Sequence, residues 1–294
     1  MLKSMLALAV AGAGTVSAAT MHFTSVAHWA PAEIASDQFE SHPAFDPLNG
    51  DLYFVRSSPE FVGWRILTSH CGADGWSKPR DAAFAGDGAE ADPWFTPDGH
   101  GLYFISTRST DGIKRKDLDV WRVDRRDASH WGTPIRLPAP INSTGNEWFP
   151  RLAPDGWLYF GSDRPGGHGK TDIWRARQDP ATGWHVENAG AALNGPGDEY
   201  EPLPSPDGRT MIIMADGGLY ISHHIGEVWS PKVRLGPEIT VNGSEIGAAW
   251  SQSGRSLMFA RDIKSGGSGE LFVAHRGAAE HWPPACPAPG SSRQ

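Results

Sequence analysis

The chain has 294 residues and a formal net charge of −8, with 35 glycines, 24 prolines and 13 tryptophans. This length can bury one large core, and the many Gly and Pro between aromatic clusters favour short strands over a disordered polymer. An acidic chain without clustered Lys and Arg is a poor binder of nucleic acid, so that class of partner is excluded.

The first 18 residues have the pattern of a secretory signal: an early lysine, a short apolar stretch and the small residues Val16-Ser17-Ala18. We expect cleavage after Ala18, which takes the net charge from −8 to −9 because Lys3 is lost. The alternative is a retained membrane anchor. Beyond this segment no apolar run reaches the roughly 20 residues of a spanning helix. The mature chain is therefore predicted to be periplasmic or secreted.

Two cysteines, Cys71 and Cys286, would enter an oxidising compartment with the exported chain. A disulfide between them is possible there. Sequence alone does not show that the two residues meet, so a bonded pair and two free thiols both remain open.

A unit of about 50 residues recurs along the rest of the chain. Each copy opens on a glutamate, and the spacings between these glutamates are 50, 57, 52 and 46 residues. The copies begin at Glu40, Glu90, Glu147, Glu199 and Glu245. A period of this size with strand-like content predicts a β-propeller.

Each unit divides into four predicted strands. The first runs from the glutamate to about the third following residue, and an Asn-Gly, Asp-Gly or Ser-Gly turn leads to an apolar second strand such as Leu158-Tyr159-Phe160. A polar loop precedes a third strand such as Asp172-Ile173-Trp174, and a tryptophan opens the fourth. These tryptophans are Trp76, Trp131, Trp184 and Trp229. Their recurrence at one position predicts packing between neighbouring blades.

The chain ends predict how the ring closes. Residues 28–36 resemble a fourth strand without a preceding first strand, whereas the last unit ends in a proline-broken segment, HWPPACPAPG. We therefore expect an all-β, five-bladed propeller of four-stranded antiparallel blades, closed by an N-terminal strand in blade five. A sixth blade would require a missing repeat. The predicted organisation is a signal peptide (1–18), one propeller domain (19–284) and a C-terminal tail (285–294), in a monomer.

The repeat motif, clearest in EWFPRLAPDGWLYFGSDRPGGHGKTDIW from residue 147, resembles the propeller repeat of the TolB and tricorn-protease families. The resemblance covers roughly residues 38–282 and is strongest in units two and three. TolB itself resembles a six-bladed ring behind an α/β domain, and too few residues precede Glu40 to form such a domain. The resemblance implies a WD-repeat-like fold and indicates little about function, because propellers host binding and catalysis alike. The predicted function is a binding scaffold in the bacterial envelope, with an envelope protein, a peptide or a glycan as partner.

The five glutamates head the innermost strands, so they are expected to surround one mouth of the central channel. One interpretation is a site for a basic partner or for calcium, which prefers oxygen ligands; no other cofactor is expected. The structural interpretation pairs Glu90 with Arg108 and Glu147 with Arg164, because these arginines lie four residues beyond the phenylalanine of the adjacent second strand. Gly217 and Ile263 occupy that offset in units four and five. Glu199 and Glu245 are therefore predicted to be free.

Loops between the second and third strands are expected on the same face as the glutamates. They bring a basic rim that could orient a peptide or a polar saccharide, formed by Lys114, Arg115, Lys116, His168 and Lys170. The alternative is that the Gly-Gly-x-Gly loop only makes a tight turn, capped by Asp172.

No sequence motif identifies a catalytic nucleophile in this chain. Gly-x-Ser-x-Gly and His-Glu-x-x-His motifs are absent, and the scattered histidines predict no metal site. A binding function is favoured, and whether the protein is an enzyme is left open. The enzyme alternative is a glycoside hydrolase or lyase with carboxylates at the channel mouth, for which Glu199, Glu245 and Asp92 are the candidates.

Overall fold

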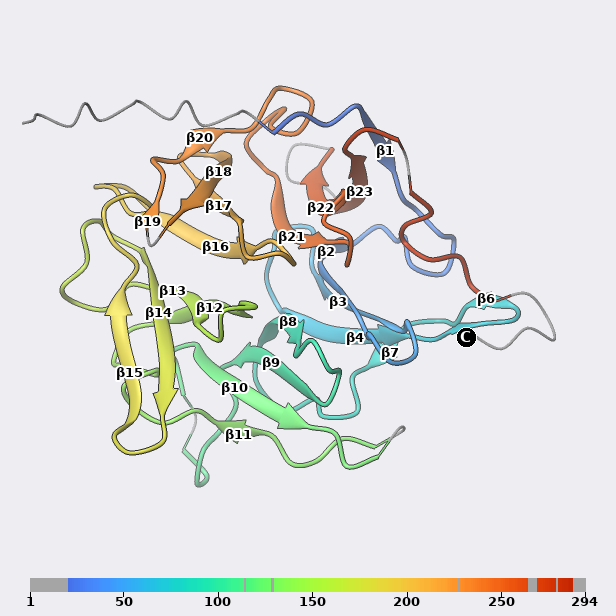
Figure 1. Cartoon of the computed structure of the whole chain (residues 1–294). Coiled ribbons are helices and arrows are strands. Elements are labelled where there is room, and N and C mark those ends of the chain that lie inside the picture. The colour runs from blue at the N-terminus through green and yellow to red at the C-terminus, as the bar shows by residue number, and fades with distance from the viewer. Residues whose placement is uncertain are drawn as a thin grey trace, which may run out of the picture.

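The computed structural model describes residues 21–113, 115–127, 130–226, 228–263, 269–278 and 280–287. The predicted signal segment and residues 288–294 of the predicted tail lie outside these ranges. The described residues form strands and no helix, and five antiparallel sheets stand around a central axis (Figure 1). The predicted five-bladed propeller is confirmed. No helix in the described ranges is long and apolar enough to cross a membrane.

Blades one to three follow the predicted strand order from the axis outward. Blade one contains β2 (Phe39–Phe45), β3 (Leu52–Ser57), β4 (Arg65–Ser69) and β7 (Arg80–Asp81), with an extra hairpin of β5 (Cys71–Gly72) and β6 (Gly75–Trp76). Blade two contains β8 (Glu90–Phe95), β9 (Gly101–Ser106), β10 (Asp119–Asp124) and β11 (Ile135–Arg136). Blade three contains β12 (Glu147–Leu152), β13 (Leu158–Ser162), β14 (Asp172–Asp179) and β15 (Gly183–Asn188).

Blades four and five vary the outer position. Blade four contains β16 (Glu199–Pro204), β17 (Thr210–Ala215) and β18 (Gly218–Ile225), and its outer position is shared by β19 (Val228–Trp229) and β20 (Val233–Arg234), which both pair with β18. Blade five contains β21 (Ile246–Trp250), β22 (Ser256–Asp262) and β23 (Gly269–His275), with β1 (Ser25–His28) as its outer strand.

The ring closes through β1, as predicted. This strand pairs antiparallel with β23 over four residues, from Ser25 opposite His275 to His28 opposite Phe272. The predicted position of the closing strand, residues 28–36, was wrong by several residues. Pro31 has no N–H to donate, and its carbonyl accepts the N–H groups of Ile34 and Ala35 in a turn. The strand therefore lies before the proline, and the following turn packs Ile34 into the core.

The second strands are buried on both faces because each lies between neighbouring blades. Their central phenylalanines, Phe54, Phe104, Phe160 and Phe259, have no exposed surface. This explains why these strands read as continuous apolar runs and not as alternating ones. Two of the recurring tryptophans join blades as predicted: the Trp131 indole donates to the Tyr53 hydroxyl at 3.0 Å, and Trp229 packs edge-on against Tyr159.

A disulfide joins Cys71 and Cys286, which are 215 residues apart in sequence. The question that the sequence left open is thereby answered. The bond ties residues 280–286, here called the strap, to the β5–β6 hairpin of blade one. The strap leaves blade five after β23, so the bond adds a covalent link between the last and first blades.

Candidate functional site

The five glutamates that open the repeats are buried, and each is held within its own blade. Their exposed fractions do not exceed 2%. In every blade the residue four positions earlier donates a hydrogen bond to the carboxylate. The donors are Ser36 Oγ, Gly86 N, Ser143 N, Gly195 N and Val241 N, at 2.6, 2.9, 3.1, 2.8 and 2.9 Å. The carboxylate thus ties down the loop that enters each blade.

A cation completes this arrangement in all five blades. Arg108 pairs with Glu90, and Arg164 pairs with Glu147 at 3.0 Å, as the repeat predicted. The prediction that Glu199 and Glu245 are free was wrong, because Lys232 lies 3.0 Å from Glu199 and Arg261 lies 3.0 Å from Glu245. In blade one, Arg56 pairs with Glu40 at 2.7 Å.

For Glu245 the error lay in the expected offset of the arginine, whereas the partner of Glu199, Lys232, lies outside the second strand. Arg56 and Arg261 lie two residues beyond the phenylalanine of the second strand, not four, and side chains two residues apart project from the same face of a strand. In four blades the guanidinium also lies over that phenylalanine. The distances to the ring centroid are 5.4 Å (Arg56–Phe54), 4.8 Å (Arg108–Phe104), 5.0 Å (Arg164–Phe160) and 5.2 Å (Arg261–Phe259).

The predicted basic rim is only partly described, because Lys114 lies outside the described residues. Arg115 is bound to Asp117 at 2.7 Å and to Asp119 at 2.6 Å. His168 and Lys170 are exposed, and the nearest carboxylate to the Lys170 ammonium is Asp198 at 3.7 Å. Lys116 is exposed as well. A ligand role for this rim and for the glutamates stays a prediction.

Asp172 caps the Gly-Gly-x-Gly loop, as the structural interpretation predicted. Its carboxylate accepts the backbone N–H groups of His168 and Gly169, the latter at 2.9 Å. Within the described ranges, no group of three or more His, Cys, Asp or Glu could hold a metal ion. The calcium site stays a prediction.

A β-bulge interrupts the first strand of every blade, two residues after the glutamate. The residue there has a left-handed backbone conformation in each case, and a bulge re-aims its side chain. These residues are His42 (φ 51°), Asp92 (φ 59°), Phe149 (φ 51°), Glu201 (φ 54°) and Gly247 (φ 66°). Four of the five are not glycine, so the fold tolerates backbone strain at the axis to place these side chains there.

The bulge residues converge on the axis with Arg151, and we call His42, Asp92, Phe149, Arg151 and Glu201 the axial cluster. The Asp92 carboxylate accepts the Phe149 N–H at 2.8 Å and lies 3.4 Å from the His42 imidazole. Glu201 accepts the N–H of Gly247 at 2.7 Å, while its other oxygen has no partner within the described chain. No polar member is more than 5% exposed. The axial cluster therefore plugs the channel.

Burial shifts the pKa of each acid in this cluster. Desolvation raises the pKa of Asp92 to about 7, against the opposing charge of Arg151. Desolvation raises the pKa of Glu201 to about 8, and the neighbouring Asp92 charge adds to that rise. Desolvation lowers the pKa of His42 to about 3, so the imidazole is neutral near pH 7. Near pH 7 the Asp92 carboxylate therefore provides most of the negative charge that balances the Arg151 guanidinium, while the Glu201 carboxyl group stays protonated.

Glu201→Gln is expected to change how stability depends on pH. Because the folded-state pKa of Glu201 is raised from 4.5 to about 8, the stability it contributes is complete below about pH 4.5 and is lost as the pH rises through 8. Glutamine keeps an acceptor for Gly247 and cannot ionise. Relative to the wild type, the variant should gain on the order of 4 kcal/mol in free energy of unfolding between pH 5 and pH 8.5.

Urea unfolding at the two pH values measures this difference. Glu60→Gln, at an exposed carboxylate, is the matched control and should leave the pH dependence as it is. An identical pH dependence for wild type and Glu201→Gln would show that the Glu201 carboxyl titrates normally.

A pocket of about 980 Å³ opens at the other end of the first strands, where the turns between first and second strands gather; we call this end the turn face. All five blades and the strap line it. Its aromatic members are Phe45, Trp94, Phe95, Trp250 and Trp282, and its prolines are Pro43, Pro47, Pro97, Pro154, Pro204, Pro206 and Pro284. We call it the aromatic pocket. None of the sequence-predicted site residues lines it.

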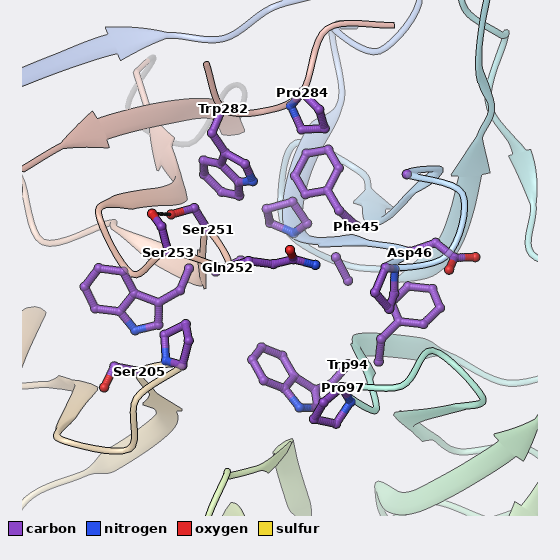
Figure 2. A pocket seen from close by; sticks show the side chains of 18 of the residues that line it. Phe45, Asp46, Trp94, Pro97, Ser205, Ser251, Gln252, Ser253, Trp282 and Pro284 are labelled. Carbon is purple, nitrogen blue, oxygen red and sulfur yellow. Dashed lines mark hydrogen bonds between the residues drawn. The ribbon is translucent and has the colours of Figure 1, made fainter. Parts of the chain in front are cut away.

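Neutral polar groups complete the wall (Figure 2). Ser205, Ser251 and Ser253 lie on one side, and Gln252 extends across the view between Trp282 and Trp94. The lining acid Asp46 is engaged elsewhere, since its carboxylate pairs with Arg125 at 2.5 Å. The pocket therefore offers aromatic surface, hydroxyl groups and an amide, with little free charge.

The strap forms one wall of the aromatic pocket. Trp282 packs against Phe45 of blade one at 5.5 Å between ring centroids, so the strap bridges blades five and one there. Glu280 anchors the start of the strap by accepting from Ser253 at 2.6 Å and from Arg255 at 3.3 Å. Burial opposes ionisation of Glu280, but hydrogen bonds from Ser251, Ser253 and Ser256 and the charge of Arg255 lower its pKa to about 2.

Trp94 connects the pocket to the axial cluster. It lines the pocket on one side, and the Arg151 guanidinium lies 4.9 Å from its ring centroid. Asp92 is the one member of the axial cluster that the sequence analysis named as a candidate site residue. The signal for His42 and Glu201 was present in the alignment of the five units, since the position before the recurring proline carries His42, Asp92 or Glu201 inside a strand that is largely apolar after its opening glutamate.

Comparisons with known proteins agree on the fold. No family model matches the chain, and no curated protein matches it. Similar solved structures include TolB from Acinetobacter baumannii, with 16% identity, a TM-score of 0.49 and 83% of this chain covered. This chain spans 56% of that TolB chain.

Two further structures match at slightly higher TM-scores. A family 117 glycoside hydrolase from Zobellia galactanivorans has 11% identity over 87% of this chain and 90% of its own, with a TM-score of 0.55. A gluconolactonase from Xanthomonas campestris has 11% identity over 87% of this chain and 93% of its own, with a TM-score of 0.50. At sequence identities this low, the similarity shows only that the proteins share the propeller fold, and this fold hosts many unrelated functions.

Proposed function

We propose that this chain is an exported, monomeric binding propeller of the bacterial envelope that holds a peptide or a glycan in the aromatic pocket without chemical turnover. The observation that carries the proposal is the pocket itself, built by all five blades and the strap. Its volume of about 980 Å³ is typical of ligand sites, which are largely apolar with a few polar groups.

The Cys71–Cys286 disulfide supports export. Disulfides persist in the periplasm and outside the cell, whereas cytosolic thiols are kept reduced. The bond also holds the strap, and with it Trp282, against the pocket. A binding site that depends on a disulfide is suited to an oxidising compartment.

The engagement of the glutamates argues against catalysis at the opposite face. A glycosidase needs two available carboxyl groups on either side of its substrate. All five glutamates at that face are instead paired with a cation and bonded to their own entry loop. Residues that serve every repeat in the same way are explained by the architecture of the blade.

The axial cluster supports a second candidate, a glycoside hydrolase or lyase. Asp92 and Glu201 are carboxyl groups with raised pKa values, and a raised pKa is what a general acid requires. Against this candidate, both carboxyl groups are at most 5% exposed and are covered by the ring of blades. Binding is therefore the better-supported function.

Trp282→Ala is expected to weaken ligand binding about tenfold, because it removes an aromatic wall of the pocket. The measurement is binding of the purified protein to arrays of synthetic peptides and oligosaccharides, followed by titration of each hit. Trp157→Ala, at a half-buried tryptophan outside the pocket, is the matched control and should retain affinity. Hits whose affinity is unchanged in Trp282→Ala would contradict the proposal.

A separate assay tests the candidate function of a glycoside hydrolase or lyase. Hydrolysis or cleavage of a polysaccharide panel by the wild type, lost in Asp92→Asn and Glu201→Gln while both variants stay folded, would replace binding by catalysis.

A further inference from the structure

A more polar groove of about 840 Å³ adjoins the aromatic pocket on the turn face, between blades four and five. The two cavities share four lining residues, Ser205, Pro206, Gln252 and Ser253. They are therefore neighbours across a single wall, which carries two hydroxyl groups and an amide. We call the second cavity the arginine groove.

The arginine groove is cationic in a chain that is acidic as a whole. Arg209, Arg255 and Arg276 line it against one lining carboxylate, Asp207, and Glu280 pairs with Arg255 from outside the groove, which leaves a surplus of one positive charge when the histidines are neutral. Its histidines are His22 and His223. The chain carries a formal net charge of −8, so this surplus does not reflect the general surface. Such a local excess attracts anions.

The contacts of these side chains leave cationic capacity in the groove. The Asp207 carboxylate accepts the Ser205 hydroxyl at 2.6 Å and the Arg209 backbone N–H at 3.0 Å. Arg276 donates to the Gly254 carbonyl at 3.4 Å, which does not neutralise its charge. Arg255 is paired with Glu280, an acid of the strap, at 3.3 Å, so Arg209 and Arg276 supply most of the available charge.

Arg209 and Arg255 are not a product of the repeat. The residue directly after the turn glycine differs among the blades: Asp51, His100, Trp157, Arg209 and Arg255. Only the adjacent blades four and five place arginine there. The Arg276 N–H donates to the Arg255 carbonyl at 2.8 Å, which brings a third arginine beside these turns. A feature confined to two neighbouring blades is better explained by a ligand than by blade architecture.

The two cavities together favour a saccharide over a peptide. Extended peptides are commonly held through main-chain hydrogen bonds, but seven of the residues that line the aromatic pocket are prolines, which have no N–H to donate. Aromatic faces suit the apolar faces of sugar rings, and the serines and Gln252 on the shared wall suit hydroxyl groups. Guanidinium groups bind carboxylates and sulfates in a bidentate manner.

We infer that the aromatic pocket and the arginine groove form one continuous site for a negatively charged saccharide, with sugar rings in the pocket and acidic groups against Arg209 and Arg276. This assignment rests on the proposed binding function and adds the class of ligand. The acidic group is a carboxylate of a uronic acid or a sulfate ester, since both match the same guanidinium geometry.

Calorimetric titration of the purified protein tests the assignment with matched tetrasaccharides. The ligands are β-1,4-linked tetraglucuronate, cellotetraose, which carries a neutral hydroxymethyl group in place of each carboxylate, and sulfated cellotetraose. We expect at least one acidic ligand to bind about tenfold or more tightly than cellotetraose, with an affinity that falls as salt is raised. The two acidic ligands distinguish a carboxylate from a sulfate as the group recognised.

Variants separate the charge from the fold. Arg209→Gln with Arg276→Gln should lower affinity for the acidic ligand about tenfold or more while leaving cellotetraose binding unchanged. Both side chains are exposed, so the melting temperature should be retained. Arg80→Gln, an exposed arginine of blade one outside both cavities, is the matched control and should bind as the wild type does.

Three outcomes would overturn the assignment. Equal affinity for acidic and neutral tetrasaccharides, or an acidic affinity unchanged in the double arginine variant, would remove the anion site and leave the aromatic pocket as the ligand site. Tighter binding of tetraglutamate than of tetraglucuronate would replace the saccharide by an acidic peptide. If neither a saccharide nor a peptide binds, the proposed binding function is refuted together with the assignment of an acidic saccharide.

Discussion

A chain that lacks residues 1–28, and with them β1, is expected to lose on the order of 5 kcal/mol of folding free energy. The deletion removes four paired residues from the outer edge of β23. It also removes Met21 and Phe23, both buried in the core between blades four and five, and each such side chain contributes about 1.5–3 kcal/mol. A loss of this size is comparable with the whole stability of many domains.

Thermal and urea unfolding of the purified deletion variant measure this effect. Deletion of residues 288–294, which leaves every described strand and Cys286 in place, is the control for chain shortening. A synthetic peptide spanning residues 19–36, added in trans, should restore part of the lost stability, because it can pair with the edge of β23. A deletion variant that unfolds at the wild-type midpoint would refute closure of the ring by β1.

Glu147→Ala is expected to destabilise the protein by about 3–5 kcal/mol, because it strands the Arg164 guanidinium in a buried position. Glu147 is fully buried and also accepts from the Ser143 N–H, the Ser143 hydroxyl and the Ser162 hydroxyl. Burial raises the pKa of this carboxyl although hydrogen bonds from Ser143 and the Arg164 charge oppose the shift. Burying the Glu147 carboxylate therefore costs desolvation free energy, and its hydrogen bonds together with the Arg164 charge offset that cost.

Differential scanning calorimetry of Glu147→Ala measures this loss. The matched control lies in the same blade: Arg175 and Glu187 form an ion pair at 2.5 Å, with side chains 28% and 37% exposed. Glu187→Ala should cost less than about 1 kcal/mol, because solvent screens exposed pairs. Equal losses in the two variants, or an unchanged melting curve for Glu147→Ala, would show that the buried carboxylate is not part of the framework of the blade.

The two ends of the first strands have different tasks in this structure. At the glutamate end, cations and entry loops are engaged blade by blade, and the axial cluster closes the channel. At the turn face, the first strands end around a cavity that the strap deepens. The expectation of a ligand at the glutamate end followed from the location of the conspicuous charges. Those charges are largely satisfied, and the proposed ligand site is at the opposite end.

The repeat by itself determined the class of fold, the number of blades and the closure by an N-terminal segment. The class of fold and the number of blades follow from local patterns with a regular period, because a strand of one unit pairs with the next strand of the same unit. The closure joins distant residues, and it could be predicted because the segment before the first repeat resembles a fourth strand and the last repeat lacks one. The Glu90–Arg108 and Glu147–Arg164 pairs and the Asp172 cap could be predicted for the same reason. Their partners lie within about 20 residues and in a register set by the hairpin.

The tertiary structure alone decided the pairing of Cys71 with Cys286, the use of Lys232 as the partner of Glu199, the axial cluster and both cavities. The Glu199–Lys232 pair joins the first strand of blade four to the segment between β19 and β20 of the same blade. The disulfide depends on the return of the chain end to blade one, and the axial cluster and the cavities depend on the rotation of one blade relative to the next. That geometry depends on how the faces of all five sheets pack around the axis. A one-dimensional pattern records which side chains recur, but it does not record which turns of different blades meet.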